Sequence, residues 1–141
     1  MDHDYDLSFF LEPPFDEDTV MRVLLLVQHM GKSGRWPRGR PDFVDQTDEA
    51  SATRPEDEPI RTVGGLVPLH APGAGRSSAG EARELERVTQ VINRLCEFSS
   101  AVDASFEVQL GGKYVGRVAK GEPDTVLSKG LLEVWKRSVE A

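Results

Sequence analysis

The sequence is poor in the residues that form disulfides and metal sites. Cys96 is the only cysteine among the 141 residues, so the chain cannot form an intramolecular disulfide. The three histidines stand in unrelated surroundings, and the ligand spacings of zinc sites are absent. Cys96 itself comes near the end of an apolar helical face, where a buried structural thiol is the usual role. We therefore expect neither a metal ion nor a cofactor.

Long hydrophobic runs and targeting signals are missing too. The longest apolar run, Val23–Val27, is far shorter than the roughly 20 residues that a membrane-spanning helix requires. The N-terminal region also lacks the basic and apolar segments of a secretory signal. These features favour a cytoplasmic protein that does not bind a membrane. The length of 141 residues favours a single domain over 1–141.

Recognisable catalytic motifs are absent as well. The sequence contains no G-x-S-x-G, no Walker loop and no dinucleotide-binding fingerprint. The segment Gly73–Ser78 is glycine-rich and precedes a predicted helix, but it lacks the lysine and the spacing of a P-loop, which favours a linker. We expect no catalytic residues and no enzymatic activity. The alternative is a small enzyme or ligand-binding module with a pocket beneath a long loop.

Acidic residues, by contrast, are in excess. The chain has 24 aspartates and glutamates against 17 lysines and arginines, a formal net charge of −7. This charge opposes direct binding to nucleic acid or to an anionic membrane, and it favours a basic protein partner. One acidic stretch lies before residue 19 and another lies between residues 42 and 58. The acids that we consider candidates for contact with such a partner are Asp16, Glu17, Asp18, Asp42, Asp45, Asp48, Glu49, Glu56, Asp57 and Glu58.

The C-terminal third has the clearest secondary-structure pattern. Ser105–Leu110 alternates apolar and polar residues, as a strand with one buried face does. Gly111 and Gly112 can adopt the positive φ angles of a tight turn, and Tyr114–Val118 is the predicted return strand. Asp124 is a predicted N-cap for a final helix over about 125–139.

The N-terminal half predicts a strand and a helix. Tyr5–Leu11 alternates in the manner of a strand, and acids at 16–18 open a helix whose buried side includes Val20, Val23 and Val27. We expect this helix to end at Gly31. A second helix is predicted over about 81–98, with Glu84 on its outer side.

The segments between these elements have no sustained periodicity. We predict a long charged loop over about 32–59 and a second loop over about 70–80, rich in small residues. Between them, Ile60–Leu69 contains Gly64, Gly65 and Pro68, which favours an edge strand or an extended loop. The element order β-α-(β)-α-β-β-α predicts an α+β fold. We expect a two-layer sandwich of a mostly antiparallel sheet with about three helices on one face.

Trp36 is a further candidate for contact with a partner. It lies in the predicted long loop, between Arg35 and Pro37, where a role in the core is not required. Two interpretations remain open: the indole anchors the loop to the sheet, or it is an exposed interface residue of the kind that dominates binding energy.

The end of the chain resembles a known group of proteins. Tyr114–Asp124 reads Tyr-Val-Gly-Arg-Val-Ala-Lys-Gly-Glu-Pro-Asp, and it leads into Gly130–Trp135. This ending resembles that of small bacterial immunity proteins encoded beside polymorphic toxins, including those of contact-dependent growth-inhibition systems. The resemblance covers about the last quarter of the chain and transfers no catalytic or binding residue. It implies an acidic cytosolic protein that binds a cognate toxin domain, often a nuclease, and blocks it.

Overall fold

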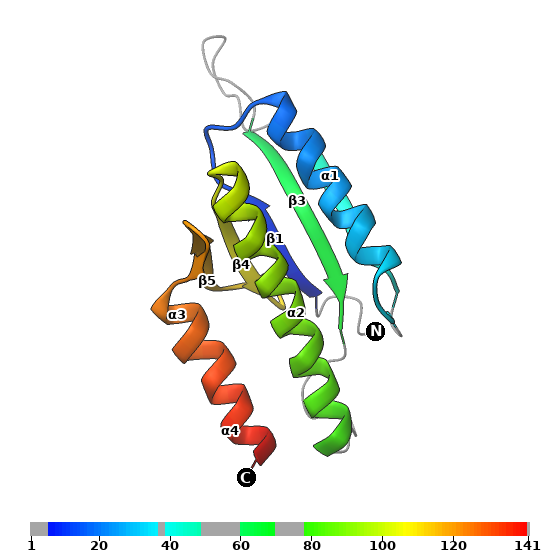
Figure 1. Cartoon of the computed structure of the whole chain (residues 1–141), viewed down its shortest axis with the longest axis vertical. Helices are drawn as coiled ribbons and strands as arrows, with labels where there is room; N and C mark the ends of the chain where they lie inside the picture. Colours follow the sequence, from blue (N-terminus) through cyan, green and yellow to red (C-terminus); the bar gives the residue numbers. More distant parts are fainter. Residues whose placement is uncertain (1–5, 37–38, 49–59, 70–77, 141) are drawn as a thin grey trace.

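A computed structural model describes residues 6–36, 39–48, 60–69 and 78–140 of the chain. The described strands are β1 (Asp6–Leu11), β2 (Asp42–Asp48), β3 (Ile60–Pro68), β4 (Phe106–Leu110), β5 (Lys113–Ala119) and β6 (Glu122–Pro123). They form one antiparallel sheet in the order β2-β3-β1-β4-β5-β6. Helices α1 (Glu17–Lys32) and α2 (Ser78–Val102) both lie over one face of this sheet (Figure 1). The predicted α+β sandwich is confirmed.

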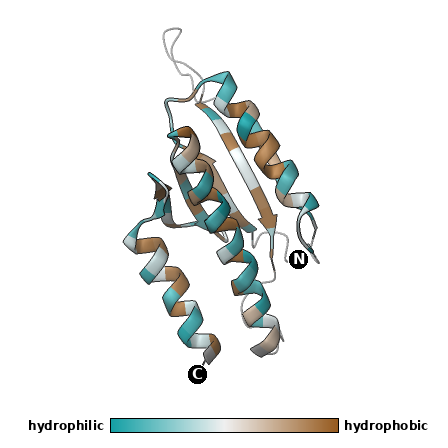
Figure 2. Cartoon of the chain, in the orientation of Figure 1, coloured by the Kyte–Doolittle hydropathy of each residue, from teal (hydrophilic) through white to brown (hydrophobic). Residues whose placement is uncertain are grey.

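The core fills the space between the sheet and these two helices. Alternate residues of β1 and β4 point to the helices, among them Phe9 and Phe106, which are fully buried and meet edge to face with ring centroids 5.8 Å apart. From α1, the predicted residues Val20, Val23 and Val27 are buried against them. The turns of α2 that face the viewer are mostly hydrophilic, whereas the strands behind them are mostly hydrophobic (Figure 2). The amphipathic pattern therefore places both helices on the sheet.

The prediction of an edge strand or loop at 60–69 is wrong, because β3 lies inside the sheet between β2 and β1. Glycine at 64 and 65 is what permits this position. A Cβ on Gly64 would overlap the carbonyl oxygen of Phe9, and a Cβ on Gly65 would lie 2.5 Å from the Phe9 ring. The two glycines therefore let β1 and its large aromatic side chain approach the backbone of β3 closely.

The prediction of one continuous loop over 32–59 is wrong as well. Residues 42–48 form β2, which pairs with β3 along its whole length, from Asp42 opposite Leu66 to Asp48 opposite Ile60. Most of β2 is exposed, so its sequence lacks the apolar alternation by which a strand is recognised. Residues 49–59 of the predicted loop, and 70–77 of the second one, lie outside the described residues.

Both long helices extend beyond their predicted ends. Helix α1 opens at the acids 16–18 as expected, with Asp16 as its N-cap, but it continues through Gly31 to Lys32. Helix α2 already includes residues 78–80 of the predicted second loop. Within it Glu84, predicted to lie on the outer side, is buried and pairs with Arg87 at 2.6 Å. This ion pair compensates the carboxylate for much of the hydration that it loses.

The C-terminal third follows its prediction closely. The strands β4 and β5 form the expected hairpin, and Asp124 accepts a hydrogen bond of 2.9 Å from the amide of Leu127 as an N-cap. A continuous helical segment then runs through α3 (Thr125–Leu127), the π-helical η2 (Ser128–Glu133) and α4 (Val134–Glu140). Leu127 is fully buried, and the Trp135 indole donates to Glu81 of α2 at 3.0 Å. This segment therefore packs beside α2 (Figure 1).

Candidate protein-binding surface

Two of the acidic candidates meet at the β2 border of the sheet, where α1 begins. Arg61 of β3 donates to both carboxylate oxygens of Asp45 in β2, each at 2.9 Å. The same guanidinium pairs with Glu17 in the first turn of α1. Successive side chains of a strand point to opposite faces of the sheet, and residues paired across two strands share a face. By this register Asp45 and Arg61 both lie on the face that α1 covers. The structure thus joins residues from three separate elements.

Arg61 also changes the acidity of the carboxyl group that it contacts most closely. Its hydrogen bonds to Asp45 lower the pKa of that carboxyl, although partial burial opposes the shift. The pKa of Arg61 rises in turn, chiefly because of Asp45 and then Glu17. Opposite charges at hydrogen-bond distance favour each other's charged form, which explains both shifts.

Removing Arg61 should therefore raise the pKa of Asp45. We expect the pKa of the Asp45 carboxyl in an Arg61→Met variant to rise toward the ordinary value of an aspartate, because the hydrogen bonds from Arg61 are the main cause of its lowering. Because its pKa is lowered in the folded wild type, the pair stabilises the fold above that value and the contribution is lost as pH falls further. The stability of the variant should then depend less on pH in this acid range.

Carboxyl chemical shifts followed by NMR through an acid titration would measure this effect. An Arg22→Met variant is the matched control, because Arg22 pairs with Asp18 at 2.8 Å and not with Asp45. An unchanged Asp45 titration in Arg61→Met would show that the guanidinium does not set its pKa.

The other acidic candidates are used in different ways. Asp16 accepts hydrogen bonds from the Thr19 amide at 2.9 Å and from the Thr19 hydroxyl at 2.8 Å, and these lower its pKa. It is therefore first of all a helix cap. The pleat turns Asp42 and Asp48 to the face away from the helices, opposite in direction to Asp45. Four more candidates, Glu49, Glu56, Asp57 and Glu58, lie outside the described residues.

The described acids form a band of negative charge along the β2 border of the sheet and the start of α1. We define the acidic border as Asp16, Glu17 and Asp18 of the α1 start together with Asp42, Asp45 and Asp48 of β2. The side chains of Glu17 and Asp18 keep 79% and 74% of their surface exposed despite their ion pairs. Between the described residues, Arg22 pairs with Asp18, and Arg61 pairs with Glu17 and Asp45. The border as a whole therefore attracts positive charge.

Trp36 is not part of this border. Its indole nitrogen donates to the carbonyl oxygen of Met30 at 3.1 Å, and the half-buried ring packs against the core. Of the two roles predicted for Trp36, the structure agrees in part with the first. The indole anchors the loop, but to the end of α1 and not to the sheet. Sequence alone left this open, since the partner is a backbone carbonyl and carries no side-chain signature.

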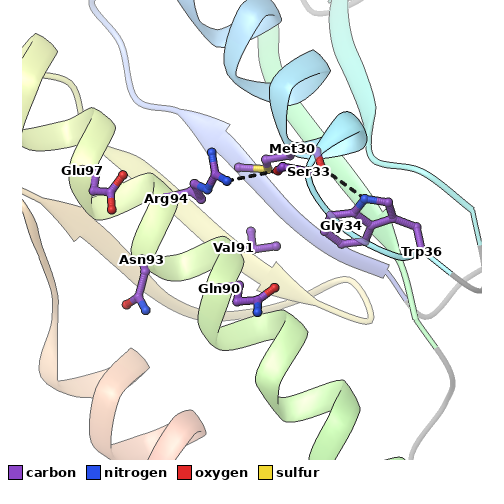
Figure 3. A pocket seen from close by; sticks show the side chains of 9 residues that line it. All are labelled: Met30, Ser33, Gly34, Trp36, Gln90, Val91, Asn93, Arg94 and Glu97. Atoms are coloured by element: carbon purple, nitrogen blue, oxygen red, sulfur yellow. Dashed lines mark hydrogen bonds between the residues drawn. The ribbon is translucent and has the colours of Figure 1, made fainter.

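Trp36 also lines a pocket of about 290 Å³ between the end of α1 and the middle of α2 (Figure 3). Arg94 of α2 reaches across it and donates to the hydroxyl of Ser33 at 3.0 Å. Met30 and Val91 supply apolar surface, and the rest of the lining includes the polar Gln90 and Asn93 and the acidic Glu97. This volume is at the lower end of the range for small-molecule sites. The sequence pattern did not single out Arg94, because its surroundings come from residues some 60 positions earlier.

Cys96 is half-buried beside this region of α2. Burial raises the pKa of its thiol, and the nearby carboxylates of Glu122 and Glu97 raise it further. The thiolate, which is the reactive form, is therefore disfavoured, in agreement with a structural role.

Further features bear on the class of site. In the part of the chain that the structure describes, no three His, Cys, Asp or Glu side chains gather in a way that could hold a metal ion. None of its described helices has the length and apolar character needed to cross a membrane. Comparison with known proteins found no match to this chain among family models, curated proteins or solved structures.

Proposed function

We propose that this chain is a cytoplasmic binding protein that neutralises a toxin domain, and that the acidic border is the surface that binds it. The observation that carries the proposal is the concentration of carboxylates on β2 and the first turn of α1, at one end of the sheet. The resemblance of Tyr114–Trp135 to immunity proteins supports the narrower identity of the partner. A toxin with nuclease activity has a basic cleft for phosphates, and carboxylates can occupy such a cleft in their place.

Three carboxylates of the acidic border are already oriented by ion pairs, which favours such a role. Asp45 and Glu17 are held by one guanidinium, and Asp18 is held by Arg22 one turn later. Carboxylates held in this way lose little further side-chain entropy when a basic surface docks. Charges of this kind also speed the encounter of two proteins and orient them, more strongly at low salt.

Removing charge from the acidic border should weaken the complex. We expect Glu17→Gln/Asp18→Asn/Asp42→Asn to bind the toxin domain encoded by the adjacent gene on the order of tenfold more weakly at low salt. The matched control is Asp103→Asn/Glu122→Gln/Glu133→Gln, which removes the same charge away from the border. Isothermal titration calorimetry would measure both variants against the wild type. No complex at micromolar concentration in low salt would refute the proposal, and equal weakening of both variants would refute the assignment of the surface.

A ligand-binding module is the second candidate function, and the pocket at Trp36 favours it. The Arg94 guanidinium lines this pocket and donates to the Ser33 hydroxyl, which leaves further donors for an anionic group, although the carboxylate of Glu97 lines the same pocket. Binding of a small anion that Arg94→Ala abolishes, in a protein that does not bind the toxin domain, would favour this function over the first.

A further inference from the structure

The two outer strands of the sheet differ in how well they are protected from additional pairing. At one border β6 has only two residues, and one of them is Pro123, which cannot donate to a neighbouring strand. At the other border β2 has seven residues and contains neither proline nor glycine. Short strands and prolines are the usual means of closing a sheet edge. The β6 border is therefore protected by a short strand and a proline, whereas the β2 border has neither.

Strand β2 is presented in a form suited to pairing. It pairs with β3 through an unbroken register of seven residue pairs. Five of its seven residues are exposed, and Phe43 and Val44 are half-buried. In the described residues no strand pairs with its outer side. Among the described residues, the outward amides and carbonyls between Asp42 and Thr47 therefore offer a template for one more strand.

The charge of β2 selects what can pair there. The strand has three aspartates and no lysine, arginine or histidine. A second copy of β2 would bring aspartates close to aspartates, which destabilises cross-strand pairs. A strand that carries lysine or arginine would instead gain from each such pairing. Asp42 lies on the face away from the helices, so the best basic residue of an added strand points to that face beside Asp42.

We propose that β2 accepts an extended, lysine- or arginine-bearing segment of the partner protein as a seventh strand. This inference rests on the proposed function, because it specifies how a basic partner engages the acidic border. Backbone hydrogen bonds supply affinity in such strand addition, and the alternating side chains supply specificity. The aspartates then have two effects: they disfavour self-association and they set the register of the added strand.

Backbone-modified peptides can separate strand addition from simple charge attraction. The probe is a nine-residue peptide of alternating valine and lysine, together with two isomers that carry N-methyl groups on either the odd or the even residues. Alternate amides of a strand point to the same side, so only one isomer would lose the hydrogen bonds to β2. We expect that isomer to bind at least about tenfold more weakly than the other, because it loses several hydrogen bonds at once.

Chemical shifts of β2 amides and their hydrogen exchange would report the binding. Exchange of the outward amides of β2 should slow when the peptide binds, and Asp42→Lys/Asp48→Lys should weaken binding, whereas Asp103→Lys/Glu122→Lys should do so much less. Equal affinity of the two isomers would overturn strand addition, since all three peptides carry the same charge. Failure of the unmodified peptide to bind would overturn it as well.

The toxin domain itself distinguishes this inference from the proposed function. A toxin complex in which the β2 amides exchange as fast as in the free protein would overturn strand addition and leave toxin binding intact. Selective binding of one peptide isomer, without any toxin complex, would support the strand-addition site and refute the toxin as its partner.

Discussion

Gly64→Ala should lower the free energy of unfolding by about 3 kcal/mol or more, because the added methyl group has no space. A Cβ at this position would overlap the Phe9 carbonyl oxygen and would lie 2.8 Å from the Phe9 carbonyl carbon and 2.9 Å from the Cα of Phe10. These are backbone atoms of the paired strand β1, so no side-chain rotation can relieve the clash. The variant can fold only if β1 and β3 move apart, which would disturb the centre of the sheet.

Gly31→Ala is the matched control for this substitution. A Cβ at Gly31 would meet nothing nearer than the Arg40 side chain at 3.9 Å, and the residue lies in the last turn of α1. Alanine is the better helix former, so we expect this variant to be unchanged or more stable by about 0.5–1 kcal/mol. Urea denaturation followed by circular dichroism would measure both. A Gly64→Ala variant as stable as Gly31→Ala would show that β1 and β3 do not approach as closely as described.

Phe106→Ala should cost about 3–5 kcal/mol of unfolding free energy, the usual result of removing a buried aromatic ring. Phe106 is fully buried, and its ring meets Phe9 at 5.8 Å and Phe98 at 5.5 Å between centroids. The ring therefore links β4 to β1 and to the end of α2. Such a loss is a large fraction of the roughly 5–15 kcal/mol that stabilises a typical domain.

Two further variants make this prediction specific. Phe106→Leu keeps most of the apolar volume and should cost clearly less than alanine. Tyr114→Ala removes another aromatic ring from the same hairpin, but Tyr114 is 52% exposed, so the expected change is only about 0.5 kcal/mol. Midpoints of urea denaturation, with similar slopes, would give the three values. Similar losses for Phe106→Ala and Tyr114→Ala would contradict the description of the core.

The acidic border shows which parts of a candidate surface a sequence reveals. The carboxylates at 16–18 were recognisable because acids accumulate in the first turn of a helix, and Asp16 indeed caps α1. Arg61 was not recognisable as their partner. It lies 16 residues from Asp45 and 44 residues from Glu17 in the chain, and it meets them only because β3 pairs with β2 beneath α1. Pairing between distant residues leaves no local pattern.

Strand β2 shows the same limit for secondary structure. Its seven residues include three aspartates, and aspartate has a low propensity for strands. Pairing with β3 supplies the backbone hydrogen bonds that make the segment a strand, so its conformation depends on a neighbour and not on its own side chains. This misprediction lies where the proposed binding surface lies. A strand whose residues are mostly exposed does not need the apolar pattern of a core strand.

The chain's own residue pattern was enough to predict the hairpin of β4 and β5, the two long helices, the N-cap Asp124 and the α+β class. Each of these depends on neighbours within a few residues, through hydrophobic periodicity, turn glycines or capping side chains. The order of strands, the interior position of β3, the border strand β2 and the Arg61 cluster depend on contacts between residues far apart in the chain. Such contacts are chosen by packing and charge pairing in three dimensions, which is why they became visible only in the folded structure.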